Sequence, residues 1–347
     1  MLRSGGSRSR QASKELRRKR TRLVSEARIS EQFEWREVGE GSKEHTAPFA
    51  AVPVRRQPRA VIHFLGGALV GAVPRTTYGY LVSELASNGF AVVVGSYGLT
   101  FEHRASAVAV AQQLDSALLS LQLSEHVENG TLPLFAVGHS NGALLHTLIA
   151  SLPELSQRSI LPLGTALMGY NNLPISLAVP GGIPEQAPAV LSSGFSFIDS
   201  LPLPPAYRLL ASALSDEDIA QQVRPIVGQL SSTLREARIL KLDHSQFHLP
   251  MIFQMIGFCT HWVVQIAEGS QDFTPSPEES RRIVADGYKC PSTLFMRFAN
   301  DSIDESATLS ARLRCVVVLC TFLSVGLTLI LFALSSFAQE CWSGRRS

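Results

Sequence analysis

From about residue 59 onward, short apolar runs alternate with segments in which apolar residues recur every three or four positions. The short runs are typical of buried strands, and the wider spacing is typical of helices that bury one face. Strands are expected over Ala60–Leu65, Phe90–Val94, Leu132–Val137, Leu163–Met168 and Thr293–Phe298, and helices over Pro74–Asn88, His103–Leu121 and the leucines from Leu144. This alternation predicts an α/β fold, a mostly parallel sheet with helices on both faces.

One stretch of this pattern, Leu132–Ile149, carries the strongest functional signal. Its apolar run ends at the pentapeptide Gly138–Gly142, GHSNG, and leucines at helical spacing follow. A strand, a sharp turn and a helix around G-x-S-x-G form a nucleophile elbow, in which the two glycines let strand and helix approach closely. Ser140 is therefore the candidate nucleophile. The N–H of Asn141, at a helix N-terminus, is a candidate donor to an oxyanion.

The other segments are arranged around this domain, which we place at residues 59–313. Residues 1–25 are basic, with seven Arg and two Lys against one Glu in the first 24, and they read as a disordered leader or an organelle transit peptide. Residues 26–58 form a lead-in segment. Prolines and an acidic cluster interrupt the alternation at about 174–268, which predicts a largely helical cap. Apart from the basic leader, the chain is on balance acidic, so no nucleic-acid partner is expected.

A candidate acid follows the last of these strands. A Ser-Pro-Glu-Glu capping sequence at Ser276 starts a helix, and the next strand delivers Asn-Asp-Ser-Ile-Asp to the carboxyl edge of the sheet. In open α/β folds that edge carries the chemistry. Asp301 follows the strand most closely and is the preferred acid. Asp304 is the alternative, although it could instead cap the helix that starts at Glu305.

The C-terminal part contains 24 consecutive uncharged residues, from Cys315 to Ala338, rich in Leu, Val and Phe. This length is enough to span a bilayer, so the segment 315–338 predicts a transmembrane helix that tethers the protein to a membrane. Basic residues flank it on both sides, which leaves its orientation open.

Several stretches resemble one family: AVIHFLGGALVGAVPRTTYGYLVSELASNGFAVVVGSYGLTFEH, FAVGHSNGALLH, GYNN and DFTPSPEES followed by LFMRFANDSIDES. They are similar to domain of unknown function 1350, α/β-hydrolase-like proteins of photosynthetic organisms, over roughly Trp35–Leu313. The resemblance implies an α/β-hydrolase-like fold and a chloroplast location. It also implies that Gly66 and Gly67 form the oxyanion turn, that Ser140 is the nucleophile and that Asp301 or Asp304 is the acid.

The sequence departs from this pattern at the base. In α/β-hydrolases the triad runs in the order Ser, acid, His, but the last histidine here is His261, ahead of Asp301. Two explanations stay open: a membrane-tethered relative that lost its base, or a C-terminus of the sequence that differs from the translated one. The second is favoured because loss of the last strand and helix would leave a sheet edge unpaired.

The remaining histidines have structural readings beside their functional ones. His139, within the elbow, is expected to pack, with a side chain that points away from that of Ser140. His63 and His103 are expected to be core or helix-start residues. His244, which follows Asp243, and His248 present two imidazoles four residues apart that could share a metal only with a third nearby ligand, so no metal is expected. No Gly-rich phosphate loop is present, so no nucleotide or other cofactor is expected.

Two functions follow from these residues. The first is a serine hydrolase of the esterase or lipase type that acts on an acyl ester or acyl lipid through Ser140 and Asp301. The alternative is a non-catalytic, membrane-anchored α/β-hydrolase scaffold that binds a ligand or partner, because no histidine follows the acid strand. The fold alone does not choose between them.

Overall fold

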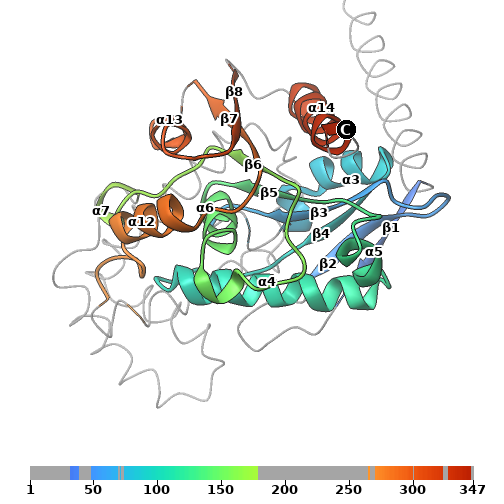
Figure 1. Ribbon diagram of the computed structural model, residues 1–347, viewed down its shortest axis with the longest axis horizontal. Coiled ribbons are helices and arrows are strands. Elements are labelled where there is room, and N and C mark those ends of the chain that lie inside the picture. The colour runs from blue at the N-terminus through green and yellow to red at the C-terminus, as the bar shows by residue number, and fades with distance from the viewer. Residues whose placement is uncertain are drawn as a thin grey trace, which may run out of the picture.

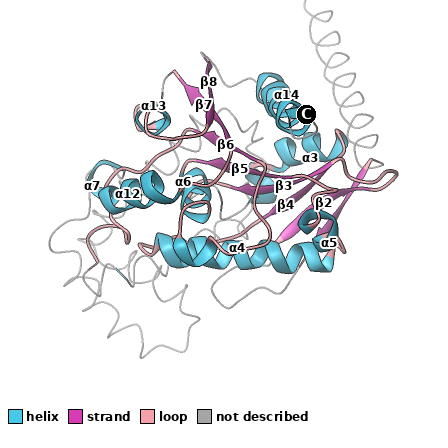
Figure 2. Cartoon of the chain, in the orientation of Figure 1, coloured by secondary structure: helices cyan, strands magenta, loops and turns pink. Residues whose placement is uncertain are grey.

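The computed structural model describes residues 32–38, 48–68, 71, 74–178, 265, 270–299, 301–322 and 327–344. Its centre is one eight-stranded sheet in the order β1-β2-β4-β3-β5-β6-β7-β8. Figure 2 shows the strands in magenta. The pairs β1–β2 and β2–β4 are antiparallel, and all other neighbours are parallel. The strands are β1 (Phe33–Glu37), β2 (Phe49–Pro53), β3 (Ala60–Leu65), β4 (Phe90–Val94), β5 (Leu134–His139), β6 (Gly164–Met168), β7 (Ser292–Phe298) and β8 (Val316–Phe322).

Helices cover both faces of this sheet (Figure 1). One face packs against α3 and α14, and the other packs against α4, α6 and α12, with a separate hydrophobic cluster on each face. The described helices are α2 (Pro74–Thr77), α3 (Gly79–Ser87), α4 (His103–Ser120), α5 (Ser124–Glu128), α6 (Asn141–Ile149), the 3-10 helix η2 (Pro153–Leu155), α7 (Ile175–Ala178), α12 (Pro277–Gly287), α13 (Ser306–Ser310) and α14 (Leu327–Gly344).

The predicted α/β fold, with a mostly parallel sheet and helices on both faces, is confirmed. The strands β3 and β4 have the predicted bounds, because each is a short apolar run closed by glycine or polar residues. The helix predicted over Pro74–Asn88 is instead two helices, α2 and α3, separated at Tyr78. This break places the Tyr78 ring against Phe64 of β3, with ring centroids 4.8 Å apart.

The lead-in segment contributes two strands that the sequence pattern did not reveal. β1 and β2 form an antiparallel pair, and β2 joins the sheet beside β4. Trp35 and Phe49, the two aromatic residues of this segment expected to anchor it, lie edge to face with ring centroids 5.4 Å apart. The segment therefore forms one edge of the α/β sheet.

The C-terminal apolar segment differs from the prediction of one membrane-spanning helix over 315–338. It is divided into β8 and α14, and β8 pairs in parallel with β7 along seven residues. Among the residues that the structure describes, no helix is long and apolar enough to cross a membrane. A strand of a parallel sheet and the helix that covers it can both be apolar, so together they read as one continuous run. The argument from a missing last strand was wrong, because β8 occupies that place.

Other predictions lie largely outside the described residues. These are the basic leader at 1–25 and most of the cap at 174–268, including Asp243, His244, His248 and His261. Of the predicted cap, the structure describes the short helix α7 and Gln265. The Gln265 side chain accepts hydrogen bonds from the Thr100 hydroxyl and the Phe101 N–H, which ties this position to the loop after β4.

Two phenylalanines of α14 test its place in the core. Phe337 is buried and contacts the Gly164 position of β6, whereas Phe332 is 73% exposed. We expect Phe337→Ala to lower the free energy of unfolding by about 3 kcal/mol or more, because it leaves a cavity against the sheet. The matched control Phe332→Ala should change it by less than about 0.5 kcal/mol. Urea unfolding measures both, and equal small losses would contradict the packing of α14.

Candidate active site

The elbow expected around Ser140 has a distinctive backbone. β5 ends at His139, α6 begins at Asn141, and Ser140 between them has φ 54° and ψ −119°. Residues other than glycine rarely adopt a positive φ, because it strains the backbone. Such strained residues are found mainly at functional sites. The Ser140 N–H donates to the Met168 carbonyl at the end of β6, which fixes the turn on the sheet. Ser140 thus lies at the carboxyl edge, between strand and helix.

The two glycines of the elbow are required by close backbone contacts. A Cβ at Gly142 would lie 2.3 Å from the Leu65 carbonyl oxygen and 2.5 Å from that of Gly66. A Cβ at Gly138 would lie 2.5 Å from the Gly142 carbonyl oxygen. All three distances are shorter than a real Cβ atom tolerates, so only glycine fits at either position. The first turn of α6 is thereby pressed against the turn after β3.

That turn contains Gly66 and Gly67, the oxyanion residues expected from the resemblance. The Gly67 N–H donates to the Tyr78 hydroxyl oxygen at 2.9 Å, and the Tyr97 hydroxyl donates to the Gly66 carbonyl. Asn141 is the first residue of α6, so its N–H is one of the four helix amides without an intrahelical acceptor. The structure therefore brings Ser140, Asn141 and the Gly66–Gly67 turn together.

Asp301 lies past the end of β7 and faces the position of Gly169. Its Oδ2 is 3.0 Å from where a Gly169 Cβ would be, and the Nε2 of His139 is 3.9 Å from the same point. Gly169 has φ +52°, and its lack of a side chain leaves this space open between the two groups. Burial raises the pKa of Asp301, and the nearby Asp304 carboxylate raises it further. The hydrogen bond that Asp301 accepts from the Ile303 N–H lowers this pKa. Asp301 and His139 therefore converge on one point.

Asp304 has different surroundings. Its Oδ1 accepts the Ser306 N–H at 2.7 Å at the start of α13, and its side chain is only 1% exposed. The Nε of Arg297 lies 3.8 Å from the other carboxylate oxygen. Asp304 therefore holds the turn that precedes α13, but the N-cap of this helix is Glu305, so the capping role expected for Asp304 is not the one observed.

His139 lies at the centre of a group that sequence reasoning did not assemble. Its Nδ1 is 2.8 Å from the Tyr78 hydroxyl oxygen, which also accepts the Gly67 N–H. Desolvation lowers the pKa of His139 to about 4, so the ring is neutral at pH 7. Desolvation raises the pKa of Tyr78, so its hydroxyl keeps its proton. The sequence drew attention to His139 beside the serine, but its contact with Tyr78 spans 61 residues and no sequence pattern indicates it.

The other described histidines considered as candidates make different contacts. His63 is buried in the core beside His146, with ring centroids 5.0 Å apart and edge to face. His103 is buried at the start of α4 and stacks on Phe273 at 4.3 Å. Among the residues the structure describes, no group of three or more His, Cys, Asp or Glu side chains could hold a metal ion.

The family match covers most of the chain. Residues 34–325 match the family described as "Protein of unknown function (DUF1350)". The chain belongs to the DUF1350 family. The match includes β8, so this strand is part of the family's sequence pattern rather than an addition to it. Among curated proteins, none matches the chain.

Three of the solved structures similar to this DUF1350 protein, all at low sequence identity, are named as an α/β-hydrolase, an esterase and a lipase. A peroxisomal α/β-hydrolase from Saccharomyces cerevisiae is 11% identical, with a TM-score of 0.49 and 91% coverage of each chain. An inhibited esterase B from Lactobacillus rhamnosis is 12% identical, with a TM-score of 0.46, over 97% of this chain and 99% of the other. A lipase in its open form is 17% identical, with a TM-score of 0.41, over 83% and 90%.

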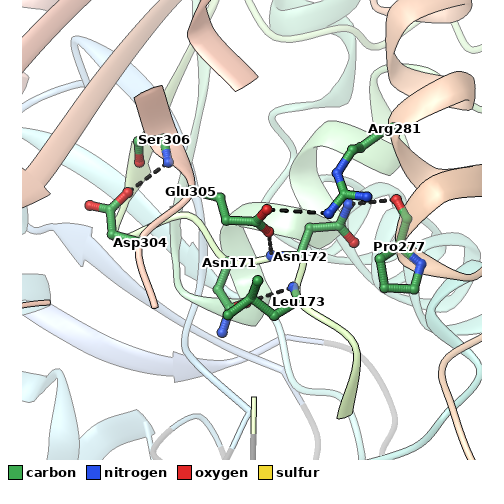
Figure 3. Close-up of polar contacts among 8 residues, drawn as sticks. All are labelled: Asn171, Asn172, Leu173, Pro277, Arg281, Asp304, Glu305 and Ser306. Atoms are coloured by element: carbon green, nitrogen blue, oxygen red, sulfur yellow. Dashed lines mark hydrogen bonds and ion pairs between the residues drawn. The ribbon is translucent and has the colours of Figure 1, made fainter. Parts of the chain in front are cut away.

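A second polar cluster of the DUF1350 chain lies beside the site, and sequence reasoning missed it (Figure 3). The Asn172 N–H donates to the Glu305 carboxylate at 2.9 Å, and the Asn172 side-chain amide donates to the Pro277 carbonyl at 3.0 Å. Arg281 of α12 pairs with the same carboxylate at 3.2 Å, and the Glu305 N–H donates to the Tyr170 carbonyl. The cluster joins the segment after β6 to α12 and to the loop that carries Asp301. The available signal was the GYNN sequence at the end of a strand.

Proposed function

We propose that the protein is a serine hydrolase that cleaves an acyl ester, with Ser140 as its nucleophile. The observation that carries the proposal is the backbone of Ser140, which has positive φ between a buried strand and a helix. A serine held at this cost, with glycines on both sides in close contact, fits a role in chemistry better than a role in packing.

In the proposed reaction, the Ser140 oxygen attacks the ester carbonyl carbon, and the carbonyl oxygen becomes an oxyanion. The Asn141 N–H and the Gly66–Gly67 turn stabilise that negative charge. The serine proton passes to a histidine and then to the leaving alcohol as the ester bond breaks. Water then attacks the acyl-serine, which releases the carboxylic acid and restores Ser140. Asp301 supports the imidazole that carries the proton.

The histidine that accepts the serine proton is open to direct test. A serine hydroxyl without a base is a weak nucleophile, so loss of the base should abolish reaction at Ser140. We propose single His→Gln changes at His139, His244, His248 and His261. The variant that loses reaction with an organophosphonate probe while keeping the wild-type unfolding profile identifies the base.

The main test is labelling of the full chain with a fluorophosphonate probe. We expect the wild-type protein to be labelled and Ser140→Ala to show no labelling above background, because the probe reacts with an activated serine. Ser156→Ala, which removes a hydroxyl that hydrogen-bonds only locally to the Pro153 carbonyl, is the matched control and should be labelled as the wild type. Hydrolysis of a series of acyl esters with increasing chain length then defines the substrate.

The alternative is a non-catalytic α/β-hydrolase scaffold that binds a ligand or partner. It is favoured by the lack of a histidine among residues 302–347 and by the Gly67 N–H, which already has an acceptor in Tyr78. Equal labelling of the wild type and Ser140→Ala, together with no turnover of any ester, would replace the hydrolase proposal with this one.

A further inference from the structure

The Gly67 N–H, the Tyr78 hydroxyl and the His139 ring form one continuous chain of hydrogen bonds. The Gly67 N–H lies 2.9 Å from the Tyr78 oxygen, and that oxygen lies 2.8 Å from His139 Nδ1. Each residue comes from a different part of the fold: the turn after β3, the break between α2 and α3, and the end of β5. This series of hydrogen bonds therefore connects the oxyanion turn with the residue that precedes Ser140.

The direction of this chain follows from the carboxylate at its far end. Asp301 Oδ2 and His139 Nε2 both face the Gly169 position, at 3.0 Å and 3.9 Å from it. A carboxylate stabilises a nearby N–H and repels a nearby lone pair, so the proton of the neutral ring belongs on Nε2. Nδ1 is then an acceptor, and the Tyr78 hydroxyl donates to it. The Gly67 N–H thus donates to Tyr78, the Tyr78 hydroxyl donates to His139, and the His139 Nε2–H points toward Asp301.

We infer that Tyr78 and His139 are positioning residues that fix the oxyanion turn and link it to Asp301. The inference rests on the proposed function, because it assigns a task in the same reaction. The Tyr78 ring also packs against the turn itself, since a Cβ at Gly66 would lie 2.6 Å from its Cε2 atom. The hydroxyl holds Gly67 while the ring limits its movement, so the turn keeps one conformation beside α6 during acyl transfer.

Tyr78→Phe tests the role of the hydroxyl with little change in ring packing. We expect the rate of fluorophosphonate labelling at Ser140 to fall about 10- to 100-fold, as for other small misplacements of catalytic groups. The loss should be in kcat rather than KM for ester substrates, because the turn acts in the transition state. Tyr288→Phe is the matched control, since its hydroxyl contacts the Thr293 hydroxyl at the start of β7, and it should retain the wild-type rate.

Two measurements do not depend on hydrolysis. Hydrogen exchange of the Gly67 amide should accelerate at least about tenfold in Tyr78→Phe and remain unchanged in Tyr288→Phe, because only the first change removes its acceptor. The ¹⁵N chemical shifts of His139 should show the Nε2–H tautomer in the wild type. Asp301→Asn should lower the population of that tautomer, whereas Asp286→Asn, at an exposed position of α12, should not.

The outcomes separate the inference from the proposed function. Unchanged Gly67 exchange in Tyr78→Phe, an Nδ1–H tautomer in the wild type, or faster labelling of Tyr78→Phe would each overturn the inference. Labelling of wild type and Ser140→Ala alike would overturn the hydrolase, while accelerated Gly67 exchange would still support the hold of Tyr78 on the turn. His139→Asn adds a distinction, because asparagine keeps an acceptor near Nδ1. Partial activity supports positioning, and complete loss in a folded variant indicates that His139 is the base.

Discussion

Gly142→Ala is expected to lower the free energy of unfolding by more than about 3 kcal/mol, at the upper end of the cost of overpacking. The added methyl group would lie 2.3 Å and 2.5 Å from the carbonyl oxygens of Leu65 and Gly66. Both obstacles are backbone atoms of the turn after β3, so no side-chain rotation relieves the overlap. Either α6 or the turn must shift by about an ångström, and either movement separates Ser140 from the proposed oxyanion donors.

Gly79→Ala is the matched control for this change. A Cβ at Gly79 meets nothing within 4 Å, and the residue opens α3, so alanine should raise the free energy of unfolding by about 0.5 kcal/mol. Urea unfolding measures both stabilities. Fluorophosphonate labelling, under conditions where both variants are folded, measures the reactivity of Ser140. If Gly142→Ala were as stable and as reactive as Gly79→Ala, the close contact between α6 and the turn would be wrong.

The elements that the sequence predicted well are those specified by neighbours in the chain. The start of α12 is an example: the Ser276 side chain accepts the Glu279 N–H, and the Glu279 carboxylate accepts the Ser276 N–H. Both halves of this capping box lie within four residues, so the motif is readable without the fold. The elbow at Ser140 is readable for the same reason, since its glycines, strand and helix are contiguous.

What sequence reasoning missed depends on residues far apart in the chain. Asn172 and Glu305 are 133 residues apart, and Tyr78 and His139 are 61 apart. No periodicity records such a contact. The prediction of a transmembrane helix over 315–338 was wrong for another reason. An apolar run indicates that residues avoid water, but it does not say whether protein or lipid surrounds them. β8 pairs with β7 at the edge of the sheet, where Val316 and Leu319 remain exposed, and one face of α14 packs into the hydrophobic core.

The protein is expected to lose stability steeply as the pH falls from 6.5 toward 4. Burial lowers the pKa of His103 and of His146 to about 4, and it lowers the pKa of His63 in the same direction, from the ordinary value of 6.5. Below pH 6.5 the unfolded chain binds protons that the folded chain does not bind. Stability due to these neutral rings is therefore complete above pH 6.5 and is lost as the pH falls toward their folded pKa.

The size of this loss follows from the two pKa values. Between pH 7 and pH 5, each ring with a folded pKa near 4 should lower the free energy of unfolding by about 2 kcal/mol, so His103 and His146 together account for about 4 kcal/mol. Typical domains have about 5 to 15 kcal/mol in total. We expect the urea midpoint to fall by a large fraction of its neutral value over this range.

His103→Phe isolates one of these rings. Phenylalanine can retain the stacking on Phe273, which His103 makes at 4.3 Å, and it removes a buried Nδ1 that has no hydrogen-bond partner among the described residues. The variant should lose about 2 kcal/mol less stability than the wild type between pH 7 and pH 5, because one proton uptake is missing. His126→Gln, at an exposed position of α5, should follow the wild-type curve. If His103→Phe also followed that curve, His103 would not be a neutral buried ring, and the acid sensitivity would arise elsewhere.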